Sequence, residues 1–248
     1  MNKIIYLTRH AQAYHNVAED WSIPDAELTP LGRDQSAALR KDTERTFQRH
    51  VDLIVSSPLR RPMQTALIGC APLIERLNGQ GKPMILLPEL QEVNDLPCDT
   101  GSARKDLESN PEFASLDFSP LEPSPLPSHW SSAPTWTSKR GLFDPNRCQE
   151  RARWVRRWLR DETHPDEKHV VVVAHGDILR VIADGHRSDK PWANAEVRAF
   201  RFKAVDDHDA VLVAATEIEI TASGPDSASE ATVAKEGSDE PTSSELKN

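Results

Sequence analysis

Two histidines follow short apolar runs of the chain, where an imidazole is well placed for chemistry. His10 comes after the run Ile4–Leu7, and His175 comes after the run Val170–Ala174, in a predicted strand that begins at His169. A continuous apolar run of this length predicts a strand buried on both faces, as in a parallel sheet. Open α/β sheets bind their ligands at the carboxyl ends of such strands. We therefore expect the two imidazoles to meet at one edge of a sheet.

Arginines accompany these histidines. Arg9 directly precedes His10, while Arg60 and Arg61 stand at the predicted start of a helix after the strand Val51–Val55. A guanidinium group binds two phosphate oxygens at once and never loses its charge, and a helix N-terminus favours anions. Two histidines, at least two arginines and a helix N-terminus make a site for a tetrahedral dianion.

The elements expected around these residues alternate between strand and helix, which predicts an α/β fold. The remaining expected strands cover Met84–Leu87, Val197–Val205 and Ala210–Thr216. Helices are expected from Thr29-Pro30 to about Gln48, from Arg61 to Leu77 with a kink or break at Pro72, from Asp144-Pro145 onward, and from Asp177 to Gly185.

The stretch from about 93 to 143 is rich in proline and serine, and we expect one short helix near 102–109 and otherwise irregular structure. An insertion of this length is a lid or is disordered, and Trp130 and Trp136 favour the lid. We expect one domain over residues 1–220, followed by a disordered acidic tail over residues 221–248.

Composition limits the partners of this 248-residue chain. Its net charge of −9 and pI of about 5.5 argue against a nucleic-acid-binding protein, and no apolar stretch approaches the roughly 20 residues that span a bilayer. The N-terminal residues contain no secretory signal, and three widely spaced cysteines indicate reduced thiols. We expect a cytoplasmic protein, with the nucleus as an alternative; a homo-oligomer stays open. An acidic protein that binds phosphate needs a local cluster of cations.

Five short motifs, in this order, resemble those of the histidine phosphatase superfamily, which includes the cofactor-dependent phosphoglycerate mutases and many phosphatases. The matching residues are Arg9-His10-Ala11, Asn16, Leu28-Thr29 with Gly32 and Gln35, Ser57-Pro58-Leu59 with Arg61, Gln64 and Thr65, and His175-Gly176. They lie within residues 4–185. The resemblance implies a three-layer α/β/α sandwich with a mostly parallel central sheet.

The resemblance also implies roles. His10 would attack phosphorus and become a phosphohistidine. Arg9, Arg61 and His175 would hold the equatorial oxygens of the phosphoryl group, and Asn16 would donate to the same group. The cations take the place of the metal that other phosphatases use, so neither a metal nor an organic cofactor is implied.

The general acid is less clearly marked. The resemblance implies that Glu92 protonates the leaving oxygen and then activates water. The segment after it matches the mutase acid motif poorly, so Glu89 and Asp95 stay open as alternatives. Ala11 replaces the usual glycine of the family, and we expect its extra methyl group to be tolerated. This alanine and the stretch Pro97–Gly101 resemble a fungal branch of the family.

The expected function is a phosphatase that hydrolyses a small phosphorylated metabolite. A mutase-like phosphotransferase is less favoured, because the longer mutase-type substrate segments are missing. A non-catalytic interaction module and a natural-product enzyme that has reused the pocket also stay open. Lys139 and Arg140, in the insertion, are candidates to reach a second anionic group of a substrate.

Overall fold

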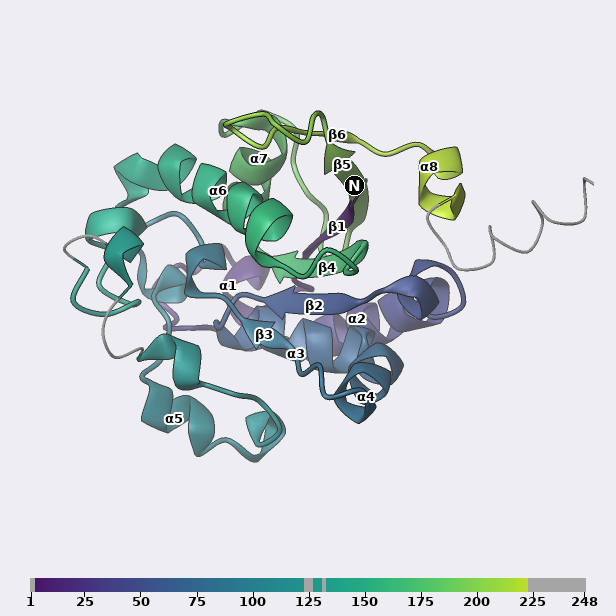
Figure 1. The fold of residues 1–248 in the computed structure, drawn as a ribbon. Coiled ribbons are helices and arrows are strands. Elements are labelled where there is room, and N and C mark those ends of the chain that lie inside the picture. Colours follow the sequence, from purple (N-terminus) through teal and green to yellow (C-terminus); the bar gives the residue numbers. More distant parts are fainter. Residues whose placement is uncertain (1–2, 123–126, 131–132, 223–248) are drawn as a thin grey trace, which may run out of the picture.

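The computed structural model describes residues 3–122, 127–130 and 133–222, and its centre is one twisted sheet (Figure 1). Its strands are β1 (Ile4–Arg9), β2 (Leu53–Ser56), β3 (Ile85–Leu86), β4 (His169–Ala174), β5 (Val197–Phe202) and β6 (Leu212–Ala214). Their order is β3-β2-β4-β1-β5-β6. The first four strands in this order are parallel, whereas β5 and β6 are antiparallel to their neighbours. The predicted mostly parallel sheet is confirmed.

The two histidine-bearing strands lie side by side at the centre of this sheet. In the register of β1 and β4, Thr8 pairs with Val173 and Arg9 pairs with Ala174. The next residue of each strand is therefore His10 and His175, at the same level of the sheet. The His10 N–H donates to the carbonyl of Ala174 at 2.9 Å, which fixes this level.

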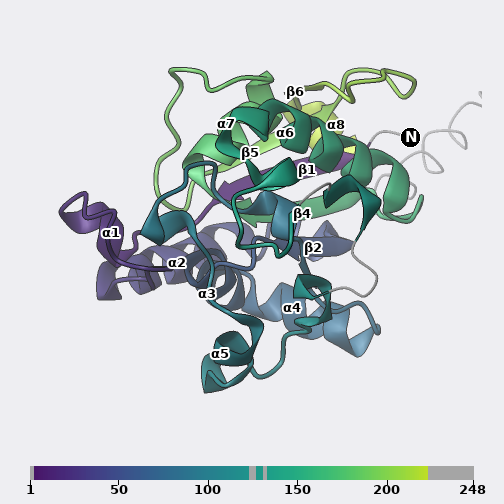
Figure 2. The ribbon, with the colours of Figure 1, turned by 90° about the vertical axis from the view of Figure 1, so that its left-hand side faces the viewer.

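Helices cover both faces of the sheet. They are α1 (Tyr14–Val17), α2 (Pro30–Thr43), α3 (Arg60–Gly69), α4 (Ala71–Gly79), α5 (Arg104–Glu108), α6 (Cys148–Arg157), α7 (Gly176–Asp184) and α8 (Glu217–Ala222). In Figure 1, α6 and α7 lie above the sheet and α2, α3 and α4 lie below it; Figure 2 shows the same layers from the side.

Alternation along the strands builds the two cores of this sandwich. Tyr6 and Ile54 belong to the apolar cluster on the α3–α4 side, and Leu7 and Val55 belong to the cluster on the α6–α7 side. Successive side chains of a strand point to opposite faces, so each strand contributes to both clusters. The chain is thus a three-layer α/β/α sandwich, as its motifs imply.

Several predicted bounds need correction. The helix expected to reach Gln48 ends at Thr43 and is followed by a separate 3-10 turn over Phe47–His50. The break expected at Pro72 is confirmed: α3 ends at Gly69 and α4 begins at Ala71, because a proline ring cannot continue the hydrogen-bonding of the preceding turn. A 3-10 turn over Pro145–Arg147 precedes α6. The last two strands are shorter than predicted.

The insertion packs against the lower layer of the sandwich through its large side chains. Phe113, Trp130 and Trp136 are buried in the apolar cluster beneath the sheet. Gly101 lies so close to Trp136 that a Cβ atom there would stand 1.8 Å from the indole ring, so glycine is required at this position. Apart from α5, the described part of the insertion consists of short 3-10 turns and irregular backbone, as predicted.

The C-terminal boundary differs slightly from the expectation. Helix α8 extends to Ala222, and therefore includes the first two residues of the predicted acidic tail. The rest of the predicted tail, residues 223–248, lies outside the described residues. Within the described ranges, no helix is both long enough and apolar enough to cross a membrane.

Candidate active site

A pocket of about 280 Å³ opens where β1 and β4 end. Its lining residues are Arg9, His10, His15, Asn16, Trp21, Arg61, Glu92, Asn94, Leu96, Asp99, Gly176 and Asp177. Five of the six predicted site residues are among them. The sixth, His175, is fully buried beside the pocket, with its ring centroid 5.2 Å from that of His10.

The orientation of His10 defines which nitrogen faces the chemistry. Its Nδ1 lies 2.7 Å from the carbonyl oxygen of Ala11. A carbonyl only accepts, so Nδ1 carries the proton and Nε2 keeps a free lone pair. Arg61 Nε donates to this Nε2 at 3.2 Å, which places the lone pair toward the arginine. The ring is therefore held in one orientation, with the Nε2 lone pair toward Arg61.

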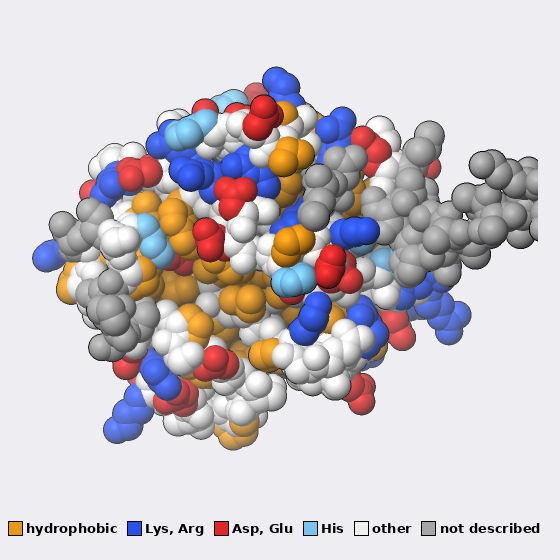
Figure 3. Space-filling view, viewed as in Figure 1, with side chains coloured by type: hydrophobic (Ala, Val, Ile, Leu, Met, Phe, Trp, Pro, Cys, Tyr) orange, Lys and Arg blue, Asp and Glu red, His pale blue; other side chains and the backbone are white. Residues whose placement is uncertain are grey.

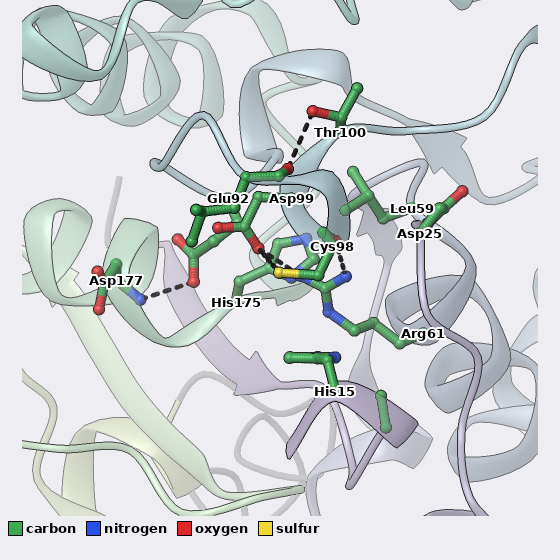
Figure 4. A network of polar contacts seen from close by, with 12 residues as sticks. His15, Asp25, Leu59, Arg61, Glu92, Cys98, Asp99, Thr100, His175 and Asp177 are labelled. Atoms are coloured by element: carbon green, nitrogen blue, oxygen red, sulfur yellow. Dashed lines mark hydrogen bonds and ion pairs between the residues drawn. The ribbon is translucent and has the colours of Figure 1, made fainter. Parts of the chain in front are cut away.

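Arg61 is held by several acceptors. From the first turn of α3, its Nη1 donates to the carbonyl of Cys98 at 2.5 Å, and its Nη2 forms an ion pair with Asp99 at 3.0 Å. Figure 4 shows Cys98, Asp99 and Arg61 around the pocket, with His175 and Glu92 nearby. Sequence reasoning missed Asp99, because nothing in the pattern Pro97-Cys98-Asp99 marks it as the partner of an arginine 38 residues earlier.

Arg9 and His175 contribute further hydrogen-bonding groups to the site. Arg9 is anchored through Nη1 to the carbonyl of Trp192, and its buried Nε has no partner among the described residues. His175 Nε2 lies 2.9 Å from the hydroxyl of Ser57, and its Nδ1 has no partner among the described residues either. Both groups thus hold unused hydrogen-bonding capacity in the buried part of the site.

The other motif residues support the loop after His10. The N–H of Ala11 donates to Thr65 Oγ1 at 3.0 Å, and the N–H of Gln12 donates to Gln35 Oε1 at 2.9 Å. A Cβ at Gly32 would lie 2.0 Å from the carbonyl oxygen of Gln12, so only glycine fits there. Ala11 is fully buried and is not among the residues with positive φ, so its backbone does not require glycine.

The carboxyl group of Glu92 lies at the N-terminus of α7. Its Oε1 accepts from the N–H groups of Val93 and Ile178 at 2.8 and 3.0 Å, and its Oε2 accepts from the N–H of Asp177 at 3.1 Å. Burial, together with the charges of Asp99 and Asp177, raises the pKa of Glu92 despite these bonds. A carboxyl group with a raised pKa is suited to hold and deliver a proton.

The two alternatives to Glu92 lie outside the pocket lining. Glu89 is buried under the insertion, where its carboxylate accepts from His129 Nε2 at 2.6 Å and Trp130 Nε1 at 2.7 Å. Asp95 is exposed on a neighbouring surface hollow. Arg140, a candidate for a second anionic subsite, is likewise exposed and does not line the pocket.

The neighbourhood keeps the histidines neutral. Burial and the guanidinium groups of Arg61 and Arg9 hold the pKa of His10 well below its ordinary value, and burial, Arg61 and His10 do the same to His175. His15 Nε2 accepts from Asn16 Nδ2 at 2.9 Å. Burial and the two arginines lower the pKa of His15 to about 3. In the described chain, no group of three or more His, Cys, Asp or Glu side chains could hold a metal ion.

A larger hollow lies elsewhere. A cleft of about 630 Å³ runs along α6, with Trp154, Trp158 and Arg157 in its wall. Acidic and basic side chains are both present in that wall, and Figure 3 shows the two kinds interspersed over the visible face of the molecule. The cleft therefore has no net preference for an anion, whereas the smaller pocket gathers arginines and imidazoles.

Sequence and structure comparisons agree with this geometry. The model of the histidine phosphatase superfamily (branch 1) matches residues 5–196. A probable phosphatase of Schizosaccharomyces pombe is 33% identical over 128 residues, which cover 51% of this chain and 56% of that protein. A phosphoglycerate mutase-like protein of Arabidopsis thaliana is 28% identical over 220 residues, covering 75% and 76% of the two chains.

A solved structure shares the fold. The crystal structure of a phosphoserine phosphatase mutant from Entamoeba histolytica superposes with a TM-score of 0.51 at 16% identity, covering 86% of this chain and 95% of that chain. The chain thus spans little more than half the length of the fission-yeast relative but nearly all of this structural one. With its family model matched over most of its length, the chain belongs to the histidine phosphatase superfamily.

Proposed function

We propose that the protein is a phosphatase that hydrolyses a small phosphorylated metabolite through a phosphohistidine on His10. The observation that carries this proposal is the state of His10: its Nδ1 is tied to the Ala11 carbonyl, and its Nε2 lone pair faces Arg61. Because its pKa is held well below the ordinary value, the ring is neutral and nucleophilic at neutral pH.

Binding of the phosphoryl group follows from the surrounding donors. A phosphate entering the pocket would take over the Arg61 N–H that points at His10 Nε2. Its other oxygens would accept from Arg9 Nε, which has no partner among the described residues, and from the His175 ring and the Asn16 amide. Arg61 and His175 are buried and Arg9 and Asn16 are partly buried, so these donors would stabilise the charge that develops in the transition state.

The reaction then needs one acid and one base. His10 Nε2 forms a bond to phosphorus as the bond to the ester oxygen breaks, and Glu92 gives its proton to that oxygen, which leaves as an alcohol. In the second step the Glu92 carboxylate takes a proton from water, and the water oxygen bonds to phosphorus as the bond from phosphorus to His10 Nε2 breaks. Phosphate leaves, and His10 and the protonated Glu92 are restored.

The size of the pocket and the completeness of the site support a small substrate and a catalyst. A volume of about 280 Å³ has room for a phosphoryl group and a short alcohol moiety. An interaction module that only kept the fold would have no need for neutral buried histidines beside arginines. We place this activity in the cytoplasm as part of the proposal, in keeping with three free cysteines.

The test is phosphate release from an aryl phosphate and from a panel of sugar, nucleotide, glycerate and serine phosphates, with EDTA present. The variant His10→Ala should lose at least about 10³-fold in turnover, while the control His186→Ala removes an exposed imidazole and should stay active. A radiolabelled substrate should leave an acid-labile, alkali-stable adduct on the wild-type chain. An active His10→Ala protein would contradict the mechanism.

A further inference from the structure

The segment that carries Glu92 is held by the distant insertion. Gln91 Nε2 donates to the carbonyl of Trp136 at 2.6 Å. Lys139, three residues further along, reaches back so that its Nζ donates to the carbonyl oxygen of Glu92 at 3.0 Å. Both contacts are buried, and each joins residues more than forty positions apart. The segment 136–139 is thus bonded to the side chain of Gln91 and to the main chain of Glu92.

Lys139 is an unusual residue in this position. It is buried, with 6% exposure, and the carboxylates of Asp99 and Glu92 are near enough to act on it electrostatically. Its backbone has φ of +51°, a left-handed conformation that costs a non-glycine residue about 1–2 kcal/mol. Burial and the nearby Arg151 lower its pKa to about 7. Strain of this kind persists where the surrounding structure imposes it and is concentrated at functional sites.

A second cation approaches the same carbonyl from the opposite layer. Arg151 of α6 is fully buried, and its Nη2 donates to the Glu92 carbonyl oxygen at 3.4 Å. Its Nε and Nη1 have no hydrogen-bond partner in the described part of the chain. Burying two basic side chains costs free energy. Lys139 and Arg151 donate to the same acceptor, the main-chain carbonyl oxygen of Glu92.

We propose that Lys139 and Arg151 are positioning residues that fix the main chain of Glu92 and thereby aim its carboxyl group at the leaving oxygen of the substrate. The inference rests on the proposed role of Glu92 as general acid. The Glu92 side chain is bonded on its other side to the N–H groups of Asp177 and Ile178. Main chain and carboxyl group are thus both restrained, and releasing the main chain would let the carboxyl group rotate with it.

This role has a signature that a purely structural role lacks. A general acid matters most when the leaving group is a weakly acidic alcohol, and it matters little when the leaving group is an acidic phenol. Misplacing Glu92 should therefore slow the hydrolysis of an alkyl phosphate and spare that of a nitrophenyl phosphate. General loss of folded protein would lower both rates by the same factor.

The experiment compares glycerol phosphate with 4-nitrophenyl phosphate in the full-length protein. Lys139→Met and Arg151→Met should each reduce turnover of the alkyl ester by about 10- to 100-fold and that of the aryl ester by less than about 3-fold. Lys139→Arg, which keeps a donor for the Glu92 carbonyl, should restore part of the alkyl rate. The matched control is Arg140→Met, which removes the exposed neighbouring cation and should change neither rate.

Glu92→Gln is measured beside them as the reference. If Glu92→Gln is selective for the alkyl ester but Lys139→Met and Arg151→Met lower both rates equally, the positioning role is overturned while the proposed function stands. If Glu92→Gln is itself unselective, Glu92 is not the general acid and the positioning role fails with it, whereas the phosphatase activity is tested separately by His10→Ala. Should Lys139→Met not fold, Arg151→Met carries the same test from the other side of the carbonyl.

Discussion

Inside the pocket, each imidazole owes its charge state to its neighbours. His10 and His175 are fully enclosed and lie near the guanidinium group of Arg61, so protonating either would bury a further positive charge beside an existing one. Neutral rings suit the chemistry, since a protonated His10 would have no lone pair for phosphorus. The same arrangement ties the stability of the fold to pH.

The sign of this pH dependence follows from the lowered pKa values. Above about pH 7, His10 is neutral in both the folded and the unfolded chain and contributes no difference. Below its unfolded pKa of about 6.5, the unfolded chain binds a proton that the folded chain cannot accept, so unfolding becomes easier. As the pH falls further, the free energy of unfolding continues to decrease until the pH reaches the lowered pKa of His10 in the folded state.

His10→Ala should therefore reduce the acid sensitivity of the fold. Between pH 7 and pH 5, one histidine that stays neutral in the folded state lowers the free energy of unfolding by about 2 kcal/mol. The decrease between these two pH values should be smaller by that amount in the variant. Urea denaturation at the two pH values measures it. The control His208→Asn removes an exposed imidazole and should leave the acid-induced loss in place. An unchanged pH response in His10→Ala would show that His10 is protonated in the fold.

At the scale of elements, the insertion is joined to the sandwich by a buried carboxylate. Glu89 stands in the 3-10 turn after β3, and its Oε1 accepts from both His129 and Trp130. The His129 ring in turn stacks on Trp154 of α6, with ring centroids 4.2 Å apart. One carboxylate thus connects the end of a strand, the insertion and the upper helical layer.

Glu89→Gln separates this structural role from catalysis. Replacing the charged acceptor should lower the free energy of unfolding by about 1–3 kcal/mol, measured by urea denaturation, with turnover of the aryl and alkyl phosphates changed by the same small factor. Glu108→Gln, which breaks the exposed pair with Arg104, is the control and should cost less than about 1 kcal/mol. A selective loss on the alkyl ester in Glu89→Gln would instead favour Glu89 as the general acid.

How far the sequence predicts these elements depends on the range of the interaction. Apolar runs and proline positions located β1, β4 and the break between α3 and α4, because those signals are local. The contacts of Asp99 with Arg61 and of Lys139 with Glu92 are not local, and no spacing rule connects them. The antiparallel pairing of β5 with β1 and with β6 likewise depends on tertiary contacts, and the sequences of these strands do not encode it.

At the scale of the whole molecule, the sheet and the candidate active site are contained within a limited part of the chain. The strands of the described part of the chain lie within residues 4–214, and the residues lining the candidate active site lie within residues 9–177. The segment 223–248 carries six acidic and two basic residues, a large share of the net charge of −9. If the domain is complete without that segment, its charge should affect only how an anionic substrate approaches.

Ending the chain after Ala222 tests this directly. We expect the melting temperature to change by less than about 2 °C and turnover of the aryl phosphate to be retained. The second-order rate constant kcat/KM should rise modestly at low salt and match the full chain at high salt, because removing negative charge eases the approach of an anion and salt screens that effect. The salt dependence of both proteins, measured with the same ester, distinguishes this electrostatic effect from packing. A fall in melting temperature together with a lower kcat would mean that the segment stabilises the domain and its site.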